Sequence, residues 1–190
     1  MSKADTIIIN GIKYIIRNKE DIIENCLYKG IQWNNDIVLL IGLCIKKYRL
    51  KHFVNIGCHI GTIALPISKY IKKVSAIEAY PPTFKHLQEN IKLNKIKNIT
   101  SYNIAVGDSE NVVYFFDPLN ERVKNNLGGM HAITNEDIKK NRLSSNLSSK
   151  QYENLMKKFD DLPINEFDIL LIDVEGREYE AIKGGYKKIK

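Results

Sequence analysis

The stretch HFVNIGCHIGT, residues 52–62, decides the fold that the sequence predicts. Residues 53–56 form a short apolar run with the length of a buried strand. Gly57 and Gly61 follow it at once, and residues 62–71 then carry apolar side chains at helical spacing. This order of strand, glycine turn and helix is typical of the first βα unit of a nucleotide-binding α/β fold.

A second strand brings an acidic residue to the position where such folds hold a ribose. Residues 74–77 read as this strand, and Glu78 follows directly. An acid at the tip of the second strand, about 20 residues after the glycine turn, can accept hydrogen bonds from ribose hydroxyls. We therefore predict that Glu78 binds the ribose of a nucleoside. Considered alone, Glu78 has a simpler interpretation as a solvated carboxylate at a strand end.

The glycine turn indicates which nucleoside the fold binds. Dinucleotide folds use G-x-G-x-x-G, whose middle glycine lets the backbone touch a pyrophosphate. His59 occupies that place here, so the turn is G-x-x-x-G and an NAD-linked enzyme is disfavoured. S-adenosylmethionine suits such a turn, because it has a ribose and an amino-acid tail but no phosphate. An ordinary tight βα turn is the alternative. Catalysis by Cys58 and His59 as a pair is disfavoured, because neighbours on a turn diverge.

Composition narrows the class of protein. The 190 residues are enough for one domain with its own core. No apolar run reaches membrane-spanning length and the N-terminus lacks a signal-peptide pattern, so we expect no membrane partner. The three cysteines are widely spaced and form no C-x-x-C pair, which predicts neither a metal site nor a disulfide framework. A reducing, cytoplasmic location fits this cysteine usage.

The net charge of +7 has two interpretations. One is a surface that binds nucleic acid. The other is a set of solvated lysines at helix ends, where cations complement the helix dipole. The lysines follow helical patterns and no cluster of arginine and aromatic residues is present, so the sequence favours the second. A nucleic-acid partner stays open as the alternative.

The residues before the central unit predict a cap. Residues 6–17 read as a β-hairpin, because Asn10-Gly11 separates two β-branched runs. Residues 21–28 read as a short helix, and a longer helix capped by Asn34 or Asn35 leads into the central strand. The apolar face expected on this longer helix consists of Ile37, Leu40, Ile41, Cys44, Ile45 and Tyr48. Trp33, just before this helix, is expected in the core or over the cofactor.

After Glu78, a helix is expected from Pro82, with Phe84, Leu87 and Ile91 on one face. Residues 99–104 read as the third strand, residues 105–108 as a turn and residues 112–116 as a hairpin-like strand. Residues 118–150 lose apolar periodicity, which predicts a mobile loop over the cofactor cleft. His131 in this loop is a candidate base, and a surface histidine is the simpler interpretation.

A fourth strand carries acids at its end. Residues 167–173 are almost wholly apolar, which predicts a strand buried on both faces, as parallel strands are. Asp173 and Glu175 follow, and residues 177–183 read as a helix that Gly184-Gly185 ends. Carboxylates at the carboxyl end of a central strand lie at the crevice of an open α/β sheet. The alternative for Asp173 is a helix cap.

Several of these segments resemble the FkbM-type methyltransferases of the class I S-adenosylmethionine-dependent group. Residues 55–61 resemble its D-x-G-A-N-x-G turn, and residues 78–94 its E-P-x-P…N-I-x-L-N segment. Residues 105–108 (AVGD) resemble the turn after its third strand. Residues 160–162 (DDL) and 172–176 (IDVEG) resemble its next block. The resemblance runs from about Trp33 to Gly185. Asn55 and Ala79 stand where the family has Asp and Pro.

The resemblance implies an α/β fold with a Rossmann-like, doubly wound class I methyltransferase sheet. It also implies O-methylation of a hydroxyl on a sugar or another small molecule. The cofactor residues it implies are Asn55, Gly57, Cys58, Ile60 and Gly61 at the methionine, Glu78 and Ala79 at the ribose, and Asn103, Ile104 and Ala105 at the adenine. Asp173 and Glu175 become candidates for the base, for metal ligands or for acceptor anchors.

Members of this family continue with further strands after the helix, whereas this chain stops at Lys190. We therefore expect a single domain that lacks the C-terminal strands. It would comprise a cap (1–32), a cofactor-binding core (33–117), the loop (118–150) and a fourth strand with its helix (151–190). An apolar edge at residues 167–173 would need a partner, such as a second copy of the chain.

Two alternatives follow. A truncated, non-catalytic binding domain is one. A nucleic-acid methyltransferase is the other, and it is disfavoured because residues 173–176 read DVEG where D/N-P-P-Y/F would be expected.

Overall fold

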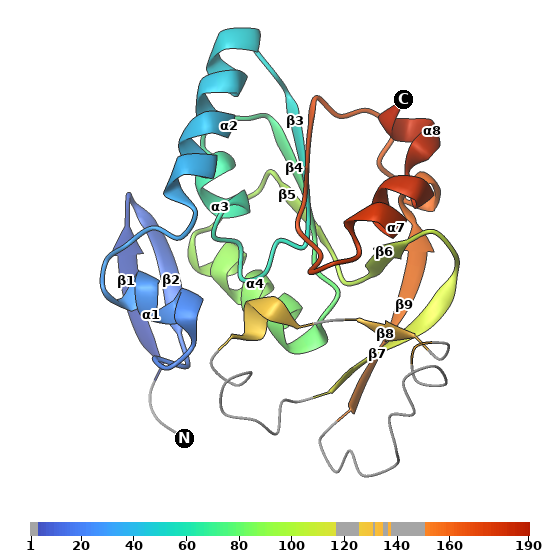
Figure 1. The fold of residues 1–190 in the computed structure, drawn as a ribbon. Coiled ribbons are helices and arrows are strands. Elements are labelled where there is room, and N and C mark those ends of the chain that lie inside the picture. The colour runs from blue at the N-terminus through green and yellow to red at the C-terminus, as the bar shows by residue number, and fades with distance from the viewer. Residues whose placement is uncertain (1–3, 117–125, 131, 135–136, 138–150) are drawn as a thin grey trace.

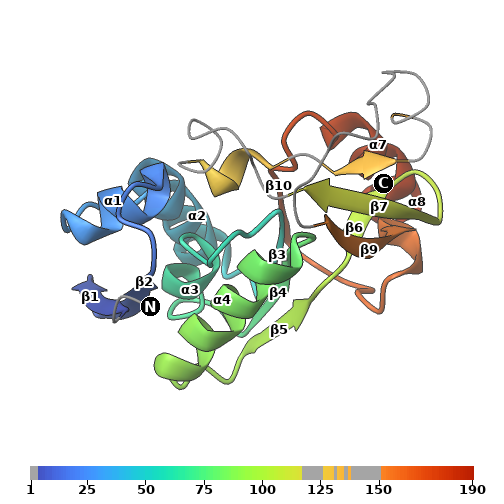
Figure 2. The same cartoon turned by 90° about the horizontal axis from the view of Figure 1, so that it is seen from below.

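The computed structural model describes residues 4–116, 126–130, 132–134, 137 and 151–190, and these form three β-sheets with flanking helices (Figure 1). The hairpin sheet and the second four-stranded sheet lie on opposite sides of a central parallel sheet, as Figure 2 also shows. The predicted loop at 118–150 and His131 fall largely outside the described residues. None of the described helices has the length and apolar character needed to cross a membrane.

The central sheet confirms the Rossmann-like fold class. Its strand order is β10-β3-β4-β5, and all neighbouring pairs are parallel. Parallel strands require crossovers, and helices provide them between β3, β4 and β5. The strands are β3 (His52–Ile56), β4 (Lys73–Ile77), β5 (Ile99–Tyr102) and β10 (Ile169–Ile172); the helices before and between the first three are α2 (Asn35–Tyr48), α3 (Ala64–Ile67) and α4 (Pro81–Leu93).

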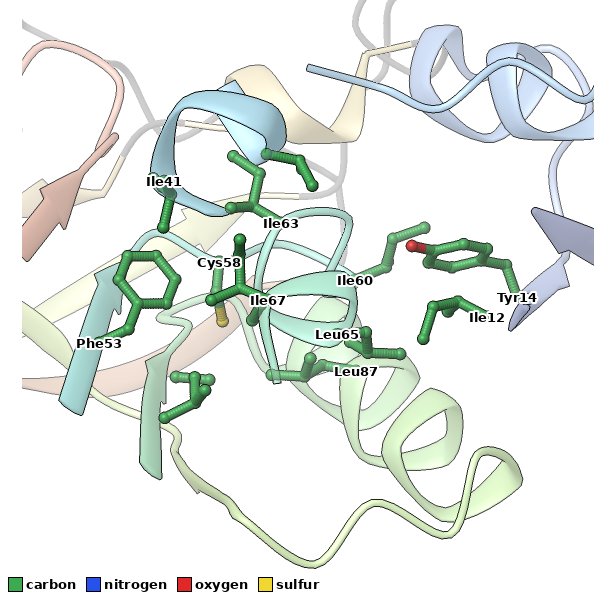
Figure 3. Close-up of a cluster of buried hydrophobic side chains, with 14 of the residues drawn as sticks. Ile12, Tyr14, Ile41, Phe53, Cys58, Ile60, Ile63, Leu65, Ile67 and Leu87 are labelled. Atoms are coloured by element: carbon green, nitrogen blue, oxygen red, sulfur yellow. The ribbon is translucent and has the colours of Figure 1, made fainter. Parts of the chain in front are cut away.

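The two faces of β3 pack into separate cores. Phe53 points into a core shared with α2, α3 and α4, which Figure 3 shows together with Ile41 and Leu87. Val54 and Ile56 point the other way, into a core with Phe159. Both faces of the strand are therefore buried, and all five of its residues are buried. Because β3 is packed on both faces, its position is fixed, and so is that of the glycine turn that follows it.

The fourth strand differs from the prediction of burial on both faces. All four residues of β10 are only partly buried. The reason is that β10 pairs with β3 on one side and forms the edge of the sheet among the described residues. The helix after it is α7 (Glu178–Gly184), and a short α8 (Tyr186–Ile189) follows at once, which the sequence did not predict.

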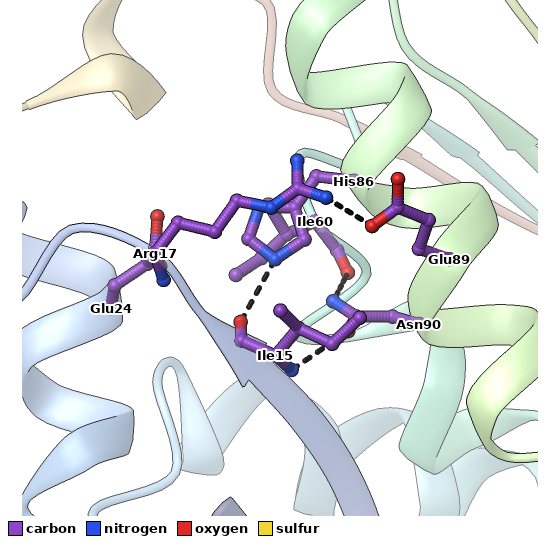
Figure 4. A network of polar contacts seen from close by, with 7 residues as sticks. All are labelled: Ile15, Arg17, Glu24, Ile60, His86, Glu89 and Asn90. Carbon is purple, nitrogen blue, oxygen red and sulfur yellow. Dashed lines mark hydrogen bonds and ion pairs between the residues drawn. The ribbon is translucent and has the colours of Figure 1, made fainter. Parts of the chain in front are cut away.

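The hairpin is confirmed as β1 (Asp5–Ile9) paired antiparallel with β2 (Ile12–Ile16). Asn10 and Gly11 take positive φ values of 50° and 72° in its turn. The hairpin packs on α4, where His86 bonds to the Ile15 carbonyl and the Asn90 side chain accepts from the Ile15 N–H (Figure 4). Asn90 also donates to the Ile60 carbonyl, so one buried amide links the hairpin to the glycine turn.

The short helix is confirmed as α1 (Ile22–Tyr28), whereas two details predicted for α2 are wrong. Asn34 has left-handed backbone and makes no side-chain cap bond, and Asn35 is already the first helical residue. Leu40 and Tyr48 are mostly exposed, at 58% and 61%. Ile41 and Ile45 are buried as predicted, and Val38 joins them in place of Leu40 and Tyr48, which lie at the margin of the apolar face.

The second sheet was not predicted as a unit. Residues 105–107 form a strand rather than a turn, because they pair in parallel with residues 156–158. The predicted strand at 112–116 exists and pairs antiparallel with strands on both sides. The order is β6-β9-β7-β8, with β6 (Ala105–Gly107), β7 (Asn111–Phe116), β8 (Ile133–Thr134) and β9 (Gln151–Lys158); two short 3₁₀ turns are η1 (Leu127–Gly129) and η2 (Phe159–Asp161).

Candidate functional site

A cavity of about 310 Å³ lies at the carboxyl ends of β3, β4 and β10, where open α/β sheets bind ligands. Most of the residues predicted to bind the cofactor or the acceptor line it together. These are Asn55, Gly57, Cys58, Glu78, Ala79, Ile104, Ala105, Asp173 and Glu175. The topology explains this convergence, because the ends of neighbouring parallel strands meet at one edge of the sheet.

Three predicted cofactor residues do not line the cavity. Ile60 is buried in the core beneath the turn. A Cβ at Gly61 would lie 1.8 Å from the Leu65 side chain, so this glycine serves close packing of the helix on the turn. Asn103 donates to the carbonyls of Glu78 and Ala79, at 2.8 and 3.2 Å, and so fixes the backbone after β4. These three residues support the cavity indirectly, because they position the backbone of the residues that line it.

Gly57 brings the ends of β3 and β10 together. Its φ is +80°, and a Cβ there would lie 1.7 Å from the Asp173 carbonyl oxygen. The N–H groups of Gly57 and Cys58 both donate to the Ile77 carbonyl, at 2.9 and 3.0 Å. Only glycine allows this approach, so the turn places Glu78 and Asp173 on the same cavity.

Glu78 is held rigidly in the cavity wall. One carboxylate oxygen accepts from the His59 N–H and the other from the Tyr80 N–H, both at 2.9 Å. Desolvation raises the pKa of Glu78 to about 7, although these hydrogen bonds act to lower it. A carboxylate with two fixed acceptor oxygens matches the geometry that a pair of ribose hydroxyls requires.

Asn55 provides a second acceptor in the same wall. Its side chain is 1% exposed, and its Oδ1 has no hydrogen-bond partner among the described residues. A buried amide oxygen without a partner costs free energy unless a ligand supplies a donor. The two ring nitrogens of His59 are also unpartnered within the described chain, and burial lowers the pKa of His59 to about 4. His59 is therefore neutral at physiological pH.

Asp173 and Glu175 lie at the mouth of the cavity. Asp173 is accessible to solvent, and partial desolvation together with the nearby Glu178 carboxylate raises its pKa. Glu178 accepts from the N–H groups of Val174 and Gly176, at 3.0 and 3.2 Å, and so orders the turn between them. Asp173 does not cap α7, which begins at Glu178 without a side-chain cap bond. Within the described ranges, no group of three His, Cys, Asp or Glu residues could hold a metal ion.

The opposite side of the cavity, which we call the roof, was largely missed from the sequence. It consists of Ile22 and Ile23 of α1, Trp33, residues 126–128, Met130, Ala132, and Phe115 and Met156 of the second sheet. Tyr80 joins it to the wall, with ring centroids 5.5 Å from Phe115 and 5.3 Å from Tyr152. Trp33 both lines the cavity and packs against the core, which settles the alternatives left open for it.

Asp21 links two parts of the roof, and Arg177 links the roof to the end of β10. Asp21 caps α1 through Oδ1, and its Oδ2 accepts from the Leu127 N–H at 2.9 Å. Arg177 donates from Nε to the Ala132 carbonyl at 2.9 Å and pairs with the carboxylate of Asp137. No short sequence motif marks either contact, because each joins residues at least 40 positions apart.

The charges of the cavity limit its ligands. The described lining residues include three carboxylates, Glu78, Asp173 and Glu175, and one guanidinium, Arg177, which is already paired. Such a lining favours neutral or cationic ligands over phosphates. This agrees with His59 in place of the glycine on which a pyrophosphate would lie.

Comparison with known proteins supports the class of fold. Residues 50–143 match the family model of the TRM5/TYW2 methyltransferase domain. Among solved structures, the chain is similar to P. horikoshii TYW2 in complex with MeSAdo, at 30% identity over 54% of this chain and 36% of that one, with a TM-score of 0.41. It is also similar to M. jannaschii TYW2 in complex with AdoMet, at 22% identity over 57% and 48% of the two chains, with a TM-score of 0.36. No curated protein matches the chain.

The chain thus spans less than half the length of these two solved relatives. Its fold is that of a class I methyltransferase, which agrees with the S-adenosylmethionine site that the sequence predicts. The family model that matches is not the FkbM family, to which the motifs had pointed. The match therefore supports the class of fold and leaves the family and the methyl acceptor open.

Proposed function

We propose that the protein is an S-adenosylmethionine-dependent methyltransferase that methylates a hydroxyl group. The observation that carries this proposal is the pairing of two acceptors in one cavity wall. The Asn55 amide oxygen is buried and unpartnered among the described residues, and the Glu78 carboxylate is held by two backbone N–H groups. An ammonium group and a pair of ribose hydroxyls are the donors that these acceptors suit.

The residues present fit this cofactor. The cavity volume is at the lower end of the range for small-molecule sites. Glu78 would hold the ribose, Asn55 the methionine ammonium group, and Ile104 the adenine. The acidic lining adds attraction for a sulfonium cation.

When bound, S-adenosylmethionine supplies a methyl group whose bond to sulfur breaks, the electron pair returning to sulfur, as the bond to the acceptor oxygen forms. The chain's own contribution is orientation and proton removal. Asp173 is the group we assign to the proton of the acceptor hydroxyl. Its raised pKa makes it a better base than an ordinary aspartate, and it remains accessible at the cavity mouth. Glu175, at φ +53° on the same turn, would orient the acceptor.

The acceptor that best suits this mouth is a neutral, hydroxylated small molecule such as a sugar. Asp173 and Glu175 would repel a phosphate brought next to the methyl group. The FkbM resemblance implies the same acceptor class.

Nucleic acid is the second candidate acceptor. Two observations favour it: the matching family model is of the TRM5/TYW2, tRNA-modifying type, and the chain has a net charge of +7. A base carried into the cavity would have to leave its phosphates outside, on the cationic surface of the protein.

Isothermal titration of S-adenosylmethionine tests the cofactor site. We expect micromolar binding that Glu78→Ala weakens at least about 30-fold, since two hydrogen bonds to a charged group are lost. Glu110→Ala, at an exposed loop position, is the matched control and should bind like the parent protein. Absence of binding by the folded protein would disprove the proposal.

Transfer of a radiolabelled methyl group then separates the two acceptors. Labelling of a pool of hydroxylated small molecules, abolished in Asp173→Asn, would support the first candidate. Labelling of bulk tRNA in preference to that pool would replace it with the second.

A further inference from the structure

A second hollow, of about 950 Å³, runs along α2 and is separate from the cofactor cavity. One side is a stripe of α2 residues spaced three and four apart, which places them on one face of the helix. The other side comes from the end of α3, the turn that follows it and Asn10 of the hairpin. Figure 1 shows α2 and α3 side by side with the hairpin next to them. The α2 stripe consists of Asn35, Val38, Leu39, Gly42, Leu43 and Lys46.

The floor and rim of this groove are apolar and open to solvent. Leu39, Leu43 and Tyr70 are 58%, 66% and 64% exposed and all line the same hollow. Single exposed leucines are ordinary on protein surfaces, but large apolar side chains gathered on one concave surface mark an interaction site.

Gly42 lies in the middle of this face. A Cβ at Gly42 would meet no atom within 4 Å, and its φ is not positive, so neither packing nor backbone conformation requires a glycine. Glycine in a helix interior costs about 1 kcal/mol relative to alanine. What it provides is a notch in the wall of the groove, where another chain can approach the helix closely.

Positive charge surrounds one end of the groove. Lys46, Arg49 and Lys69 line it, and no carboxylate does. The sequence reinforces this asymmetry, since residues 37–77 and 90–107 contain no Asp or Glu. Lysines at helix ends complement helix dipoles, but that explanation accounts for neither the hollow nor its exposed leucines. The cofactor cavity, with three carboxylates, has the opposite character.

From these observations we infer that the groove along α2 binds an amphipathic helix of a partner protein, with apolar side chains against Leu39 and Leu43 and acidic residues against Lys46 and Arg49. A helix fits a long concave surface with an apolar floor, and opposite charges fix its direction. A flat bilayer is not complementary in shape to a concave groove. The exposed leucines cannot form hydrogen bonds or ion pairs with an RNA backbone. The inference is independent of the proposed methyl transfer.

The test is a selection of random peptides of about 16 residues, enough to match the length of α2, against the whole chain. We expect enriched peptides to combine apolar residues at i, i+3, i+4 and i+7 with Asp or Glu. Selected peptides with no such pattern would overturn the inference. Two alternative ligands are tested in parallel: a uridine oligoribonucleotide, and phosphatidylcholine vesicles that contain phosphatidylserine. Binding of either, without peptide enrichment, would also overturn it.

Two variants make the test specific. Gly42→Leu fills the notch and replaces glycine with a good helix former, so its Tm should stay equal or rise while peptide affinity falls at least about tenfold. Lys46→Glu combined with Arg49→Glu should weaken the peptide by a similar factor. Lys72→Glu with Lys73→Glu changes the charge equally outside the groove lining and should leave peptide affinity within about twofold. Equal losses in all three would overturn the inference.

Discussion

The two sides of the cofactor cavity are built differently. The wall is formed by the ends of β3, β4 and β10, whose backbones are locked in a parallel ladder beneath a glycine turn. The roof is formed by α1, residues 126–130, Ala132 and the second sheet, and separate side-chain contacts hold it, among them those of Asp21, Asn154 and Arg177. We therefore expect the wall to lose its structure as one cooperative unit, whereas single contacts of the roof should open independently.

The largest effect should come from breaking the wall at Gly57. In Gly57→Ala, the new Cβ would have to displace the Asp173 carbonyl, 1.7 Å away, in a backbone at φ +80°. We expect the free energy of unfolding to fall by about 3 kcal/mol or more, because overpacking and backbone strain add. S-adenosylmethionine binding should be lost. Urea denaturation and titration calorimetry measure the two effects.

Gly30→Ala is the matched control for that substitution. Gly30 has a similar φ of +77°, but a Cβ there meets nothing within 4 Å. It should cost only the strain of a left-handed residue, about 1–2 kcal/mol. A Gly57→Ala protein no less stable than Gly30→Ala would contradict the close approach on which the wall depends.

The next effect concerns the protonation of Glu78 in the wall. Its pKa is raised to about 7 in the folded protein from an ordinary value of 4.5. Its contribution to stability is therefore fully present below pH 4.5 and is lost as the pH rises to about 7. Ribose hydroxyls donate to the ionised form, so cofactor affinity should change in the opposite direction. We expect binding at pH 8 to be about 30-fold tighter than at pH 5.5.

Calorimetry at the two pH values measures this, and Glu78→Gln provides the comparison. In that variant the carboxamide does not titrate, so the pH dependence of binding should largely vanish. A parent protein whose affinity is flat between pH 5.5 and pH 8 would show that Glu78 is not the group that binds the ligand.

These two predictions concern features of the wall that the sequence already indicated. They could be predicted because short, contiguous stretches of sequence specify them. The βα units at residues 52–71 and 73–93 are each specified by contiguous apolar patterns, with a glycine turn in the first and prolines at the helix start in the second, so the strands and turns of the wall could be predicted. The FkbM-like motifs gave the wall residues of the cavity, among them Asn55, Glu78 and Asp173. They did not single out a family, because the glycine turn and the acid after the second strand are common to many class I methyltransferases, and the family model that matches is that of the TRM5/TYW2 methyltransferase domain.

The roof could not be predicted in the same way. Residues 105–107 read as a turn because they are short and contain a glycine, and only pairing with residues 156–158 makes them a strand. Nothing in the sequence around Leu127 indicates that its N–H donates to Asp21, which lies 106 residues earlier. Burial of β10 was overestimated because an apolar run does not show whether a strand lies at the centre or the edge of a sheet. Long-range pairing, not local propensity, decides each of these features.

A smaller effect should follow from loosening the roof at Asp21. In Asp21→Asn, the side-chain oxygen can still cap α1, but no second carboxylate oxygen accepts from the Leu127 N–H. We expect stability to change by less than about 1 kcal/mol and cofactor dissociation to become about 3- to 10-fold faster. Asp21→Ala also removes the cap and should cost about 1 kcal/mol more. Stopped-flow dissociation and thermal unfolding distinguish the two variants. Equal dissociation rates in Asp21→Asn and the parent would mean that this contact does not hold the roof closed.

The smallest effect should come from Arg177, on the other side of the roof. Arg177→Gln keeps a donor for the Ala132 carbonyl but removes the ion pair with Asp137, which is only partly buried. Ion pairs near the surface contribute about 0.2–1 kcal/mol, so cofactor dissociation should quicken by no more than about fivefold. High salt should produce the same change in the parent protein, because it screens the pair. Lys183→Gln removes an exposed pair with Asp108 away from the cavity and should leave dissociation unchanged. If Arg177→Gln instead abolished binding as Gly57→Ala is expected to do, the roof would be as integral to the site as the wall, and the comparison drawn between them would fail.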